Sequence, residues 1–174
     1  MIIRPAKENE YERVRQFYYD LIDEMQNHPY CPAWQKDIYP RDADLASYVR
    51  RGELYLAEDG DAILGAMVLN HNSNEGYAGA PWLVDAAPGE VTALHLLGVS
   101  PSRSRQGIGM AMVQEALRLA RADKQKTVRL DVLEGNLPAE RLYPKAGFRY
   151  VDYRKLFYDD VGLCGFTLYE YPLI

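Results

Sequence analysis

Apolar residues recur at two spacings along the chain, and the two spacings predict different elements. Spacing of three and four positions, typical of one helix face, predicts a first helix that continues to Met25. Asn9 and Glu12 form a predicted capping box at its start. A second helix is predicted from its N-cap Asp42 to Arg51. Apolar runs and alternation predict strands at residues 2–5, 53–58, 62–71, 91–99, 127–133, 150–158 and 166–171.

Two further helices follow strands in the second half of the chain. One carries an apolar stripe that ends near Ala122, and a shorter one begins at Asn136 and is stopped by Gly147. The resulting order, β-α-α-β-β-β-α-β-α-β-β, predicts a mixed α/β fold on one sheet. Residues 1–174 are expected to form a single domain, because this length fits one sizeable core and no linker-like tract interrupts it.

Two segments between these elements show neither the helical spacing nor the strand alternation of apolar residues. Residues 27–40 are rich in proline and aromatic residues, and residues 72–89 hold many Gly, Asn, Ala and Pro residues. Long loops in compact domains are often functional. Trp82, in the second segment, is therefore a candidate lining residue of a binding site.

Composition and charge narrow the class of protein. The 174 residues are 48% hydrophobic and 26% charged, as in ordinary soluble globular proteins, and no apolar run is long enough to predict a transmembrane helix. The net charge of −5 argues against nucleic-acid binding, and no membrane partner is expected. Two cysteines and the absence of a signal-peptide pattern predict reduced thiols and a cytoplasmic location. No metal site is expected, because His28, His71 and His95 are scattered.

The strand at 91–99 runs into a glycine-rich turn, Val99-Ser-Pro-Ser-Arg-Ser-Arg-Gln-Gly-Ile-Gly109, that opens a helix. Such a turn directs several backbone N–H groups at one point, where the positive end of the helix dipole also lies. Gly107 and Gly109 let a ligand approach the backbone, and Arg103 and Arg105 add positive charge. These features suit a phosphate or pyrophosphate, whereas a glycine pair alone fits a basic helix start without a ligand equally well.

A second motif, Asn136-Leu-Pro-Ala-Glu-Arg-Leu-Tyr-Pro-Lys-Ala-Gly-Phe148, follows the strand at 127–133. Asn136 is a favourable N-cap. Tyr143 lies seven residues further on, two helical turns, so the two side chains are predicted to point the same way. An amide and a phenol on one face can bind a ligand, and the same residues also fit a capping Asn and a half-buried core Tyr.

With both motifs in this order, the chain resembles the GNAT superfamily of acyl-CoA-dependent N-acyltransferases. The first matching motif is Leu-Leu-Gly-Val-Ser-Pro followed by Gln106-Gly107-Ile108-Gly109, and the second is Asn136-x-x-Ala139-x-x-Leu142-Tyr143-x-x-x-Gly147-Phe148. The order of elements is similar to that fold over nearly the whole chain. The resemblance implies a central mixed, mostly antiparallel sheet flanked by helices.

The resemblance also implies that acetyl-CoA is the co-substrate and where it binds. The strands 91–99 and 127–133 are expected to splay apart, and the pantetheine arm to pair with the first of them like an added strand. The residues expected to contact the pyrophosphate or the pantetheine arm are Leu97, Gly98, Val99, Arg105, Gln106, Gly107, Ile108, Gly109 and Met110.

Two residues of the second motif match positions with roles in the family. Asn136 matches the residue that contacts the pantetheine arm or holds a water, and Tyr143 matches the tyrosine that protonates the leaving thiolate. The chain departs from the family pattern at Ser104, where Arg or Gln is usual. It departs again at Pro144, which removes a helix N–H and biases the preceding tyrosine away from helical geometry.

Acetyl transfer from a thioester to an amine needs a neutral amine, a donor for the oxyanion and a proton for the thiolate. A backbone N–H near Leu97 is the candidate oxyanion donor, and Tyr143 is expected to be protonated at neutral pH. His95 is predicted to share a strand face with Leu97 and Val99, and its resemblance to a histidine of some family members makes it a candidate base. A hydrogen-bonded core histidine is the other interpretation of His95. The alternative bases are Glu90 and Asp131.

The resemblance places the acceptor between residues 27–40 and 158–165. Aromatic and acidic side chains there suit a cationic amine, although a solvated turn and aromatics that anchor a loop explain the same composition. The acceptor is a small-molecule or peptide amine of open identity. The candidate contacts are Tyr30, Trp34, Tyr39, Trp82, Asp159 and Asp160.

The resulting hypothesis is an N-acetyltransferase that moves the acetyl group of acetyl-CoA to a primary amine by direct attack in a ternary complex. The alternative is a non-catalytic acyl-CoA-binding regulatory module, which Ser104 and Pro144 favour. A monomer or a homodimer is expected, since the aromatic residues of the last two strands fit either pairing across a dimer or covering the sheet.

Overall fold

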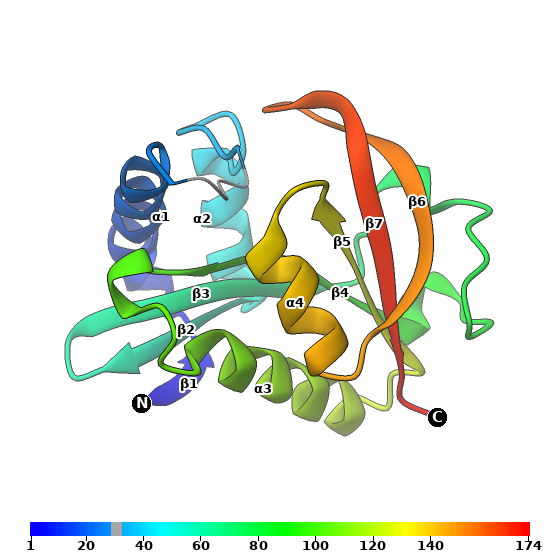
Figure 1. Cartoon of the computed structure of the whole chain (residues 1–174). Helices are drawn as coiled ribbons and strands as arrows, with labels where there is room; N and C mark the ends of the chain where they lie inside the picture. The colour runs from blue at the N-terminus through cyan, green and yellow to red at the C-terminus, as the bar shows by residue number, and fades with distance from the viewer. Residues whose placement is uncertain (29–32) are drawn as a thin grey trace.

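Seven strands form one sheet in the order β1-β2-β3-β4-β5-β7-β6 in this computed structural model, which describes residues 1–28 and 33–174 (Figure 1). Among the described strands, β4 and β5 are parallel neighbours and all other neighbouring pairs are antiparallel. This mixed, mostly antiparallel sheet confirms the predicted fold class. The strands are β1 (Ile2–Pro5), β2 (Leu54–Asp59), β3 (Ala62–Asn70), β4 (Val91–Val99), β5 (Thr127–Leu133), β6 (Arg149–Tyr158) and β7 (Gly162–Pro172).

Helices cover both faces of the sheet (Figure 1). They are α1 (Tyr11–Met25), α2 (Asp42–Arg50), α3 (Ile108–Ala122) and α4 (Leu137–Lys145). Consecutive residues of β3 point to opposite faces, so Val68 packs among the core residues of α1 and α2, and Met67 packs among those of α3. None of the helices described by the structure has the length and apolar content needed to cross a bilayer.

The first helix starts differently from the prediction. The predicted capping box of Asn9 and Glu12 is wrong, because Glu10 precedes α1 and accepts the backbone N–H of Lys7 at 2.8 Å. The Glu10 carboxylate also receives two hydrogen bonds from the guanidinium of Arg4, at 2.7 and 2.8 Å. Charge-assisted bonds of this kind are stronger than a neutral cap, and the sequence pattern of the cap alone does not contain them.

The start of α2 is also shifted by one residue from the prediction. The N-cap is Arg41, and the predicted cap Asp42 is the first helical residue. Asp37 Oδ1 accepts the backbone N–H of Asp42 at 3.0 Å, and the hydroxyl of Tyr19 donates to Asp42 Oδ1 at 2.9 Å. Asp42 therefore joins α2 to α1 through its side chain.

A β-bulge interrupts β4. The register changes from Val68 opposite His95 to Ala66 opposite Gly98, and Leu96 has a positive φ of 50°. The bulge leaves His95 on the sheet face of Val68, which α1 and α2 cover, whereas Leu97 packs on the other face with the core residues of α3. The predicted shared face of His95 and Leu97 is therefore wrong.

The bulge is held by a bond from a distant helix. The hydroxyl of Tyr18, a fully buried residue of α1, donates to the carbonyl oxygen of Leu96 at 2.8 Å. Leu96 has no Cα partner in the register of β3 and β4, and the buried tyrosine gives its carbonyl oxygen a hydrogen-bond donor.

The central pair of strands parts beyond its first residues. The parallel register of β4 and β5 covers Val91 to Ala93 opposite Thr127 to Arg129, and past this point β5 continues alone with β7. Residues 94–99 of β4 therefore have an open edge on the side of β5. The predicted splaying of these two strands is confirmed.

Candidate active site

Two cavities adjoin where β4 and β5 part. The larger has a volume of about 500 Å³ and lies between the C-terminal end of β4, the start of α3 and α4. The smaller has a volume of about 100 Å³ and lies between β4, β5 and the β6–β7 turn. Five residues line both cavities, so the cavities are neighbours along them. These residues are Trp34, Leu97, Asn136, Ala139 and Tyr143.

The glycine turn forms one wall of the larger cavity. Gly107 is the N-cap of α3 with a φ of +78°, and no atom lies within 4 Å of the position that a Cβ would take there. The amides of Ile108, Gly109 and Met110 follow in the first turn, where a helix has no acceptors of its own for them. A free surface with unpaired N–H groups at the positive end of a helix dipole is suited to a phosphate group.

Gly109 has a second role. A Cβ at this position would lie 3.4 Å from Leu142 Cδ2 and 3.8 Å from Val99 Cγ2, so the small residue lets α3 start close to both α4 and β4. Gly109 thus allows close packing of the turn against α4 and β4, whereas Gly107 leaves the surface of the turn open to a ligand.

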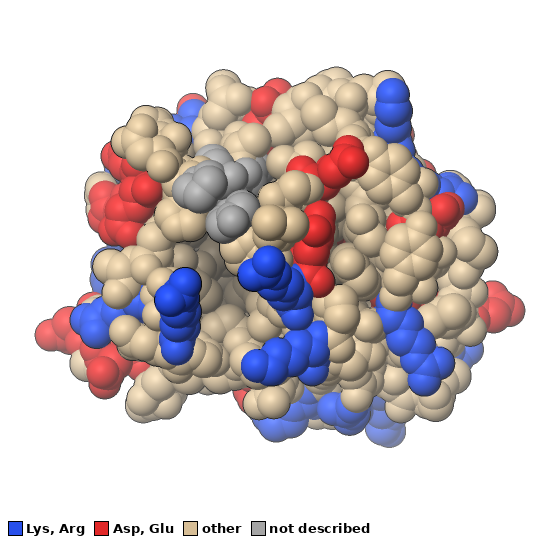
Figure 2. Space-filling model, viewed as in Figure 1, with Lys and Arg blue, Asp and Glu red and all other residues tan. Residues whose placement is uncertain are grey.

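Positive charge surrounds the larger cavity. Figure 2 shows a hollow in this face of the molecule with Lys and Arg side chains on either side of it. Arg103, Arg105 and Lys145 line the cavity, and Ser104 lines it too. The serine that departs from the family pattern therefore lies between two arginines that both reach the site. Gln106, a predicted contact, is exposed and is not among the residues that line this cavity.

The open edge of β4 forms the opposite wall. Leu97, Gly98 and Val99 line the larger cavity, beyond the last residues of β4 that pair with β5. Gly98 is packed from the other face, since a Cβ there would collide with Leu21 and would lie 3.2 Å from the ring of Trp34. An extended ligand can therefore align with the peptide groups of this edge while α1 supports it from behind.

Asn136 and Tyr143 come from opposite ends of α4. Asn136 caps the helix, with Oδ1 accepting the backbone N–H of Ala139 at 3.4 Å. The helix continues through Pro144 to Lys145, so the proline leaves Tyr143 in helical position.

The hydroxyl of Tyr143 is available at the junction of the cavities. The residue is 7% exposed, and its ring packs against Phe148 at a centroid distance of 5.5 Å. Within the described part of the chain its hydroxyl has no hydrogen-bond partner, and burial raises the pKa of Tyr143 above its ordinary value. The hydroxyl is therefore protonated and free to donate.

A half-buried carboxylate forms part of the smaller cavity. Oδ2 of Asp131, on β5, accepts hydrogen bonds from the hydroxyls of Tyr158 at 2.6 Å and Tyr77 at 2.8 Å. Burial raises the pKa of Asp131, and the two hydrogen bonds lower it by less, so the net change is upward. Among the described residues no Lys or Arg forms an ion pair with Asp131.

His95 lines the same cavity but is a weak base. Its Nε2 lies 3.0 Å from Asn70 Oδ1, and the amide nitrogen of Asn70 donates to Glu53 at 3.2 Å. The Asn70 oxygen is thus the acceptor, and we assign the ring hydrogen of His95 to Nε2. Burial lowers the pKa of His95 to about 4, so the imidazole is neutral at pH 7.

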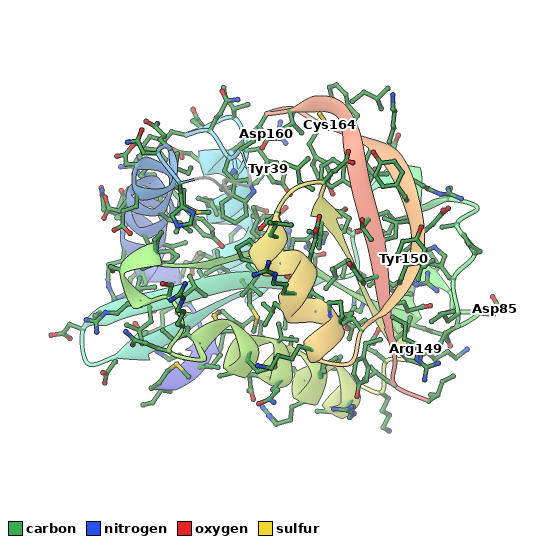
Figure 3. All side chains as sticks on the ribbon, viewed as in Figure 1. Tyr39, Asp85, Arg149, Tyr150, Asp160 and Cys164 are labelled. Atoms are coloured by element: carbon green, nitrogen blue, oxygen red, sulfur yellow. The ribbon has the colours of Figure 1, made fainter. Side chains whose placement is uncertain are left out.

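The predicted acceptor contacts are distributed unequally. Trp34, Tyr39 and Asp160 line the smaller cavity, whereas Asp159 is exposed and lines neither cavity. Tyr30 lies outside the described residues. Figure 3 shows Tyr39 and Asp160 near the β6–β7 turn, at the same end of the sheet.

Trp82 lies elsewhere and has a structural role. Its Nε1–H donates to the carbonyl oxygen of Tyr77 at 3.1 Å, and the guanidinium of Arg129 lies 4.3 Å from its ring centroid. Arg129 in turn bonds to the fully buried Glu170 at 2.9 Å. Trp82 therefore fastens the long loop to the sheet and lines neither cavity.

The sequence did not identify the two tyrosines that bind Asp131. Tyr77 lies in a short 3-10 helix of the long loop, and Tyr158 is the last residue of β6. Neither has a motif or a spacing that links it to Asp131, because the fold alone brings the three segments together. In the described chain no group of three or more His, Cys, Asp or Glu side chains is placed to hold a metal ion.

Three features of this site occur together: parted strands, a glycine turn at a helix start and a buried tyrosine between two cavities. Their geometry suits an extended, phosphate-bearing ligand. Residues 15–148 match the model of the Acetyltransferase (GNAT) family, and the chain belongs to this family. Acetyl-CoA is the co-substrate that this family uses.

One curated relative and several solved structures are similar to the chain. Mycothiol acetyltransferase of Clavibacter sepedonicus is 32% identical over 112 residues, which are 60% of this chain and 36% of that protein. The chain thus spans about a third of the length of this relative.

The solved structures share the fold at low identity. A putative acetyltransferase, yncA of Salmonella typhimurium with its cofactor acetyl-CoA, has a TM-score of 0.72 and 13% identity, covering 100% of this chain and 94% of that one. An N-acetyltransferase of Staphylococcus aureus Mu50 has a TM-score of 0.72 and 18% identity, covering 99% and 98%. Arabidopsis thaliana NAA60 in complex with a bisubstrate analogue has a TM-score of 0.70 and 19% identity, covering 98% and 97%.

Proposed function

We propose that the protein is an acetyl-CoA-dependent N-acetyltransferase that transfers the acetyl group directly to a primary amine in a ternary complex. The observation that carries this proposal is the pair of adjoining cavities with Leu97 and Tyr143 in the lining of both. Two reactants bound on either side of this junction are held close together. Proximity of this kind supplies a large part of the acceleration in a two-substrate reaction.

The larger cavity holds acetyl-CoA in this proposal. The first-turn amides of α3 bind the pyrophosphate, with Arg103 and Arg105 providing countercharge. The open edge of β4 at Leu97 and Val99 pairs with the amides of the pantetheine arm. The thioester then lies at the junction of the cavities, and the acceptor amine enters from the smaller cavity.

The chemistry follows from the groups at this junction. The amine nitrogen forms a bond to the thioester carbonyl carbon, and a backbone N–H near Leu97 stabilises the negative oxygen. The bond from carbon to sulfur then breaks, and the leaving sulfur takes the proton of the Tyr143 hydroxyl. The buried phenol is suited to this role, because it is protonated and has no hydrogen-bond partner among the described residues.

The proton of the amine goes to Asp131 in preference to His95. Asp131 lines the acceptor cavity, and its raised pKa brings this carboxylate closer to the range in which it can take a proton. His95 has a pKa of about 4 and points from the other face of the bulged strand, with Nε2 bonded to Asn70. Asp131 is therefore the better-placed base, directly or through one water.

The test combines binding with turnover. Calorimetric titration of the protein with acetyl-CoA and CoA is followed by an assay of free thiol release over a panel of primary amines. Release of one thiol for each acetylated amine supports the proposal. Binding of acetyl-CoA without release from any amine would instead indicate a non-catalytic acyl-CoA-binding module.

A further inference from the structure

Both carboxylates of the smaller cavity lack a positive partner within the described chain. Asp131 and Asp160 line this cavity, and no Lys or Arg of residues 1–28 and 33–174 lines it. The one imidazole there, His95, is neutral at pH 7 because burial holds its pKa near 4. Burying carboxylates is unfavourable unless a positive charge or several hydrogen bonds compensate for lost water.

The two carboxylates enter the cavity from different elements. Asp131 comes from β5 and is held by the hydroxyls of Tyr77 and Tyr158. Asp160 comes from the turn between β6 and β7, and its Oδ1 is buried without a hydrogen-bond partner. Burial raises the pKa of Asp160, and the backbone N–H groups of Asp160 and Val161 lower it by less. An unpartnered buried carboxylate oxygen beside a cavity is a site at which a donor from a ligand is missing.

Tyr39 connects the two carboxylates. It lines the cavity, and both Asp131 and Asp160 are near enough to raise its pKa in addition to the larger effect of burial. Its ring packs edge-on against Tyr158 at a centroid distance of 5.1 Å. The cavity of about 100 Å³ is therefore small and lined by aromatic rings, with a carboxylate on β5 and another at the turn.

The mouth of this cavity is held by a contact between loop and hairpin. Gln35 Nε2 donates to the carbonyl oxygen of Asp160 at 2.9 Å, which fixes the turn against the 33–40 segment. Asp159 is exposed on the same turn and lines neither cavity. The turn thus directs one of its two adjacent carboxylates into the site and the other to solvent.

From these contacts we infer that the acceptor is a slender dication, a short aliphatic diamine whose reacting amine lies at Asp131 while its second ammonium binds Asp160. This inference rests on the proposed function. The reacting ammonium becomes a neutral amine by giving one proton to Asp131. A second proton leaves this nitrogen as the amide forms and restores Tyr143, which has given its own proton to the leaving sulfur. The charge of the other ammonium stays on the product beside Asp160. Aromatic rings around the alkyl chain add apolar and cation–π contact.

The test compares acceptors of equal length that differ in one charge. We expect 1,4-diaminobutane to be acetylated with a kcat/KM about tenfold or more above that of n-pentylamine, since a bond to a charged group contributes about this much. Asp160→Asn is expected to raise the KM for the diamine about tenfold and to leave n-pentylamine within about twofold. Asp159→Asn removes the same charge from the next residue and is expected to change neither substrate.

Three outcomes overturn the inference. They are equal kcat/KM for the diamine and the monoamine, an equal loss for both in Asp160→Asn, and an effect of Asp159→Asn as large as that of Asp160→Asn. If no amine releases thiol, the proposed function fails, and binding of 1,4-diaminobutane to the CoA-saturated protein is measured by calorimetry instead. Binding that weakens in Asp160→Asn and not in Asp159→Asn then supports the dication site, and absence of binding overturns it.

Discussion

The hydroxyl of Tyr158 donates a hydrogen bond of 2.6 Å to Asp131 Oδ2, and this bond crosses from the last residue of β6 to the middle of β5. A second bond from Tyr77, at 2.8 Å, reaches the same oxygen from the long loop. Both bonds favour the charged carboxylate, and burial opposes it more strongly. The tyrosines therefore set how far the pKa of Asp131 rises, and with it the pH range in which Asp131 can accept a proton.

Loss of the Asp131 carboxylate is expected to stop proton transfer without affecting the CoA site. Asp131→Asn should lower kcat about 100-fold or more, the usual contribution of a general base, with the Kd for acetyl-CoA within about twofold of the original. Thiol release and calorimetric titration measure the two quantities. A variant with unchanged kcat would remove Asp131 from the mechanism.

Loss of one tyrosine hydroxyl is expected to move the pH profile in a defined direction. In Tyr158→Phe the carboxylate loses a bond that lowers its pKa, so the pKa of Asp131 rises further. Activity depends on the carboxylate form, so the acidic limb of kcat/KM against pH should move to higher pH. A limb that stays in place, or moves to lower pH, contradicts the role of this hydrogen bond.

Tyr143 is expected to act in turnover and not in binding. Tyr143→Phe keeps the ring that packs against Phe148 and removes only the hydroxyl at the junction of the cavities. We expect kcat to fall about 100-fold and the Kd for acetyl-CoA to change by less than about twofold. Equal turnover by both proteins would mean that the thiolate obtains its proton elsewhere.

The glycine turn can be tested against a matched glycine outside the site. Gly107 and Gly60 have φ values of +78° and +58°, and neither has an atom within 4 Å of its missing Cβ. Alanine at either position should lower the free energy of unfolding by about 1–2 kcal/mol because of the left-handed backbone. Gly60 lies in the β2–β3 turn, so only Gly107→Ala should weaken acetyl-CoA binding, by about tenfold. Equal affinities in calorimetry would place the pyrophosphate away from this turn.

The parts of the site that were predicted from sequence are those built by local chemistry. Gly107 needs a positive φ that few other residues adopt, and Asn136 caps a helix that begins at the next residue. Such residues reveal their role through their own type and their immediate neighbours. The cavity wall at Leu97, Gly98 and Val99 follows from the strand that leads into the same turn.

The parts that were missed depend on contacts between distant segments. Alternation along β4 predicts His95 on the face of Leu97, but the bulge at Leu96 places the two residues on opposite faces. The carbonyl oxygen of Leu96 accepts a hydrogen bond from Tyr18, which lies 78 residues away in the sequence. In the same way the adjacent Asp159 and Asp160 are equivalent in sequence. The direction of the turn, fixed by Gln35, decides which of them lines the cavity.

His95 is expected to make the free energy of unfolding depend on pH. Its pKa is about 4 in the folded protein against an ordinary value of 6.5. Between these values the unfolded chain binds a proton that the folded protein does not, so the free energy of unfolding falls as the pH is lowered from 6.5 toward 4. Above the ordinary pKa the imidazole is neutral in both states, and the free energy of unfolding has its full value. The loss reaches about 3 kcal/mol as the pH approaches 4.

The effect is isolated by a variant that cannot titrate. His95→Gln retains an amide that can donate to Asn70 Oδ1. Urea unfolding of both proteins from pH 7 to pH 4 gives the free energy of unfolding of each at every pH. The contributions of the carboxylates are common to both proteins and cancel in the difference. The original protein should lose about 3 kcal/mol more than the variant over this range. Parallel curves would mean that His95 is protonated as readily in the folded protein as in the unfolded chain, and the argument against His95 as the base would lose its support.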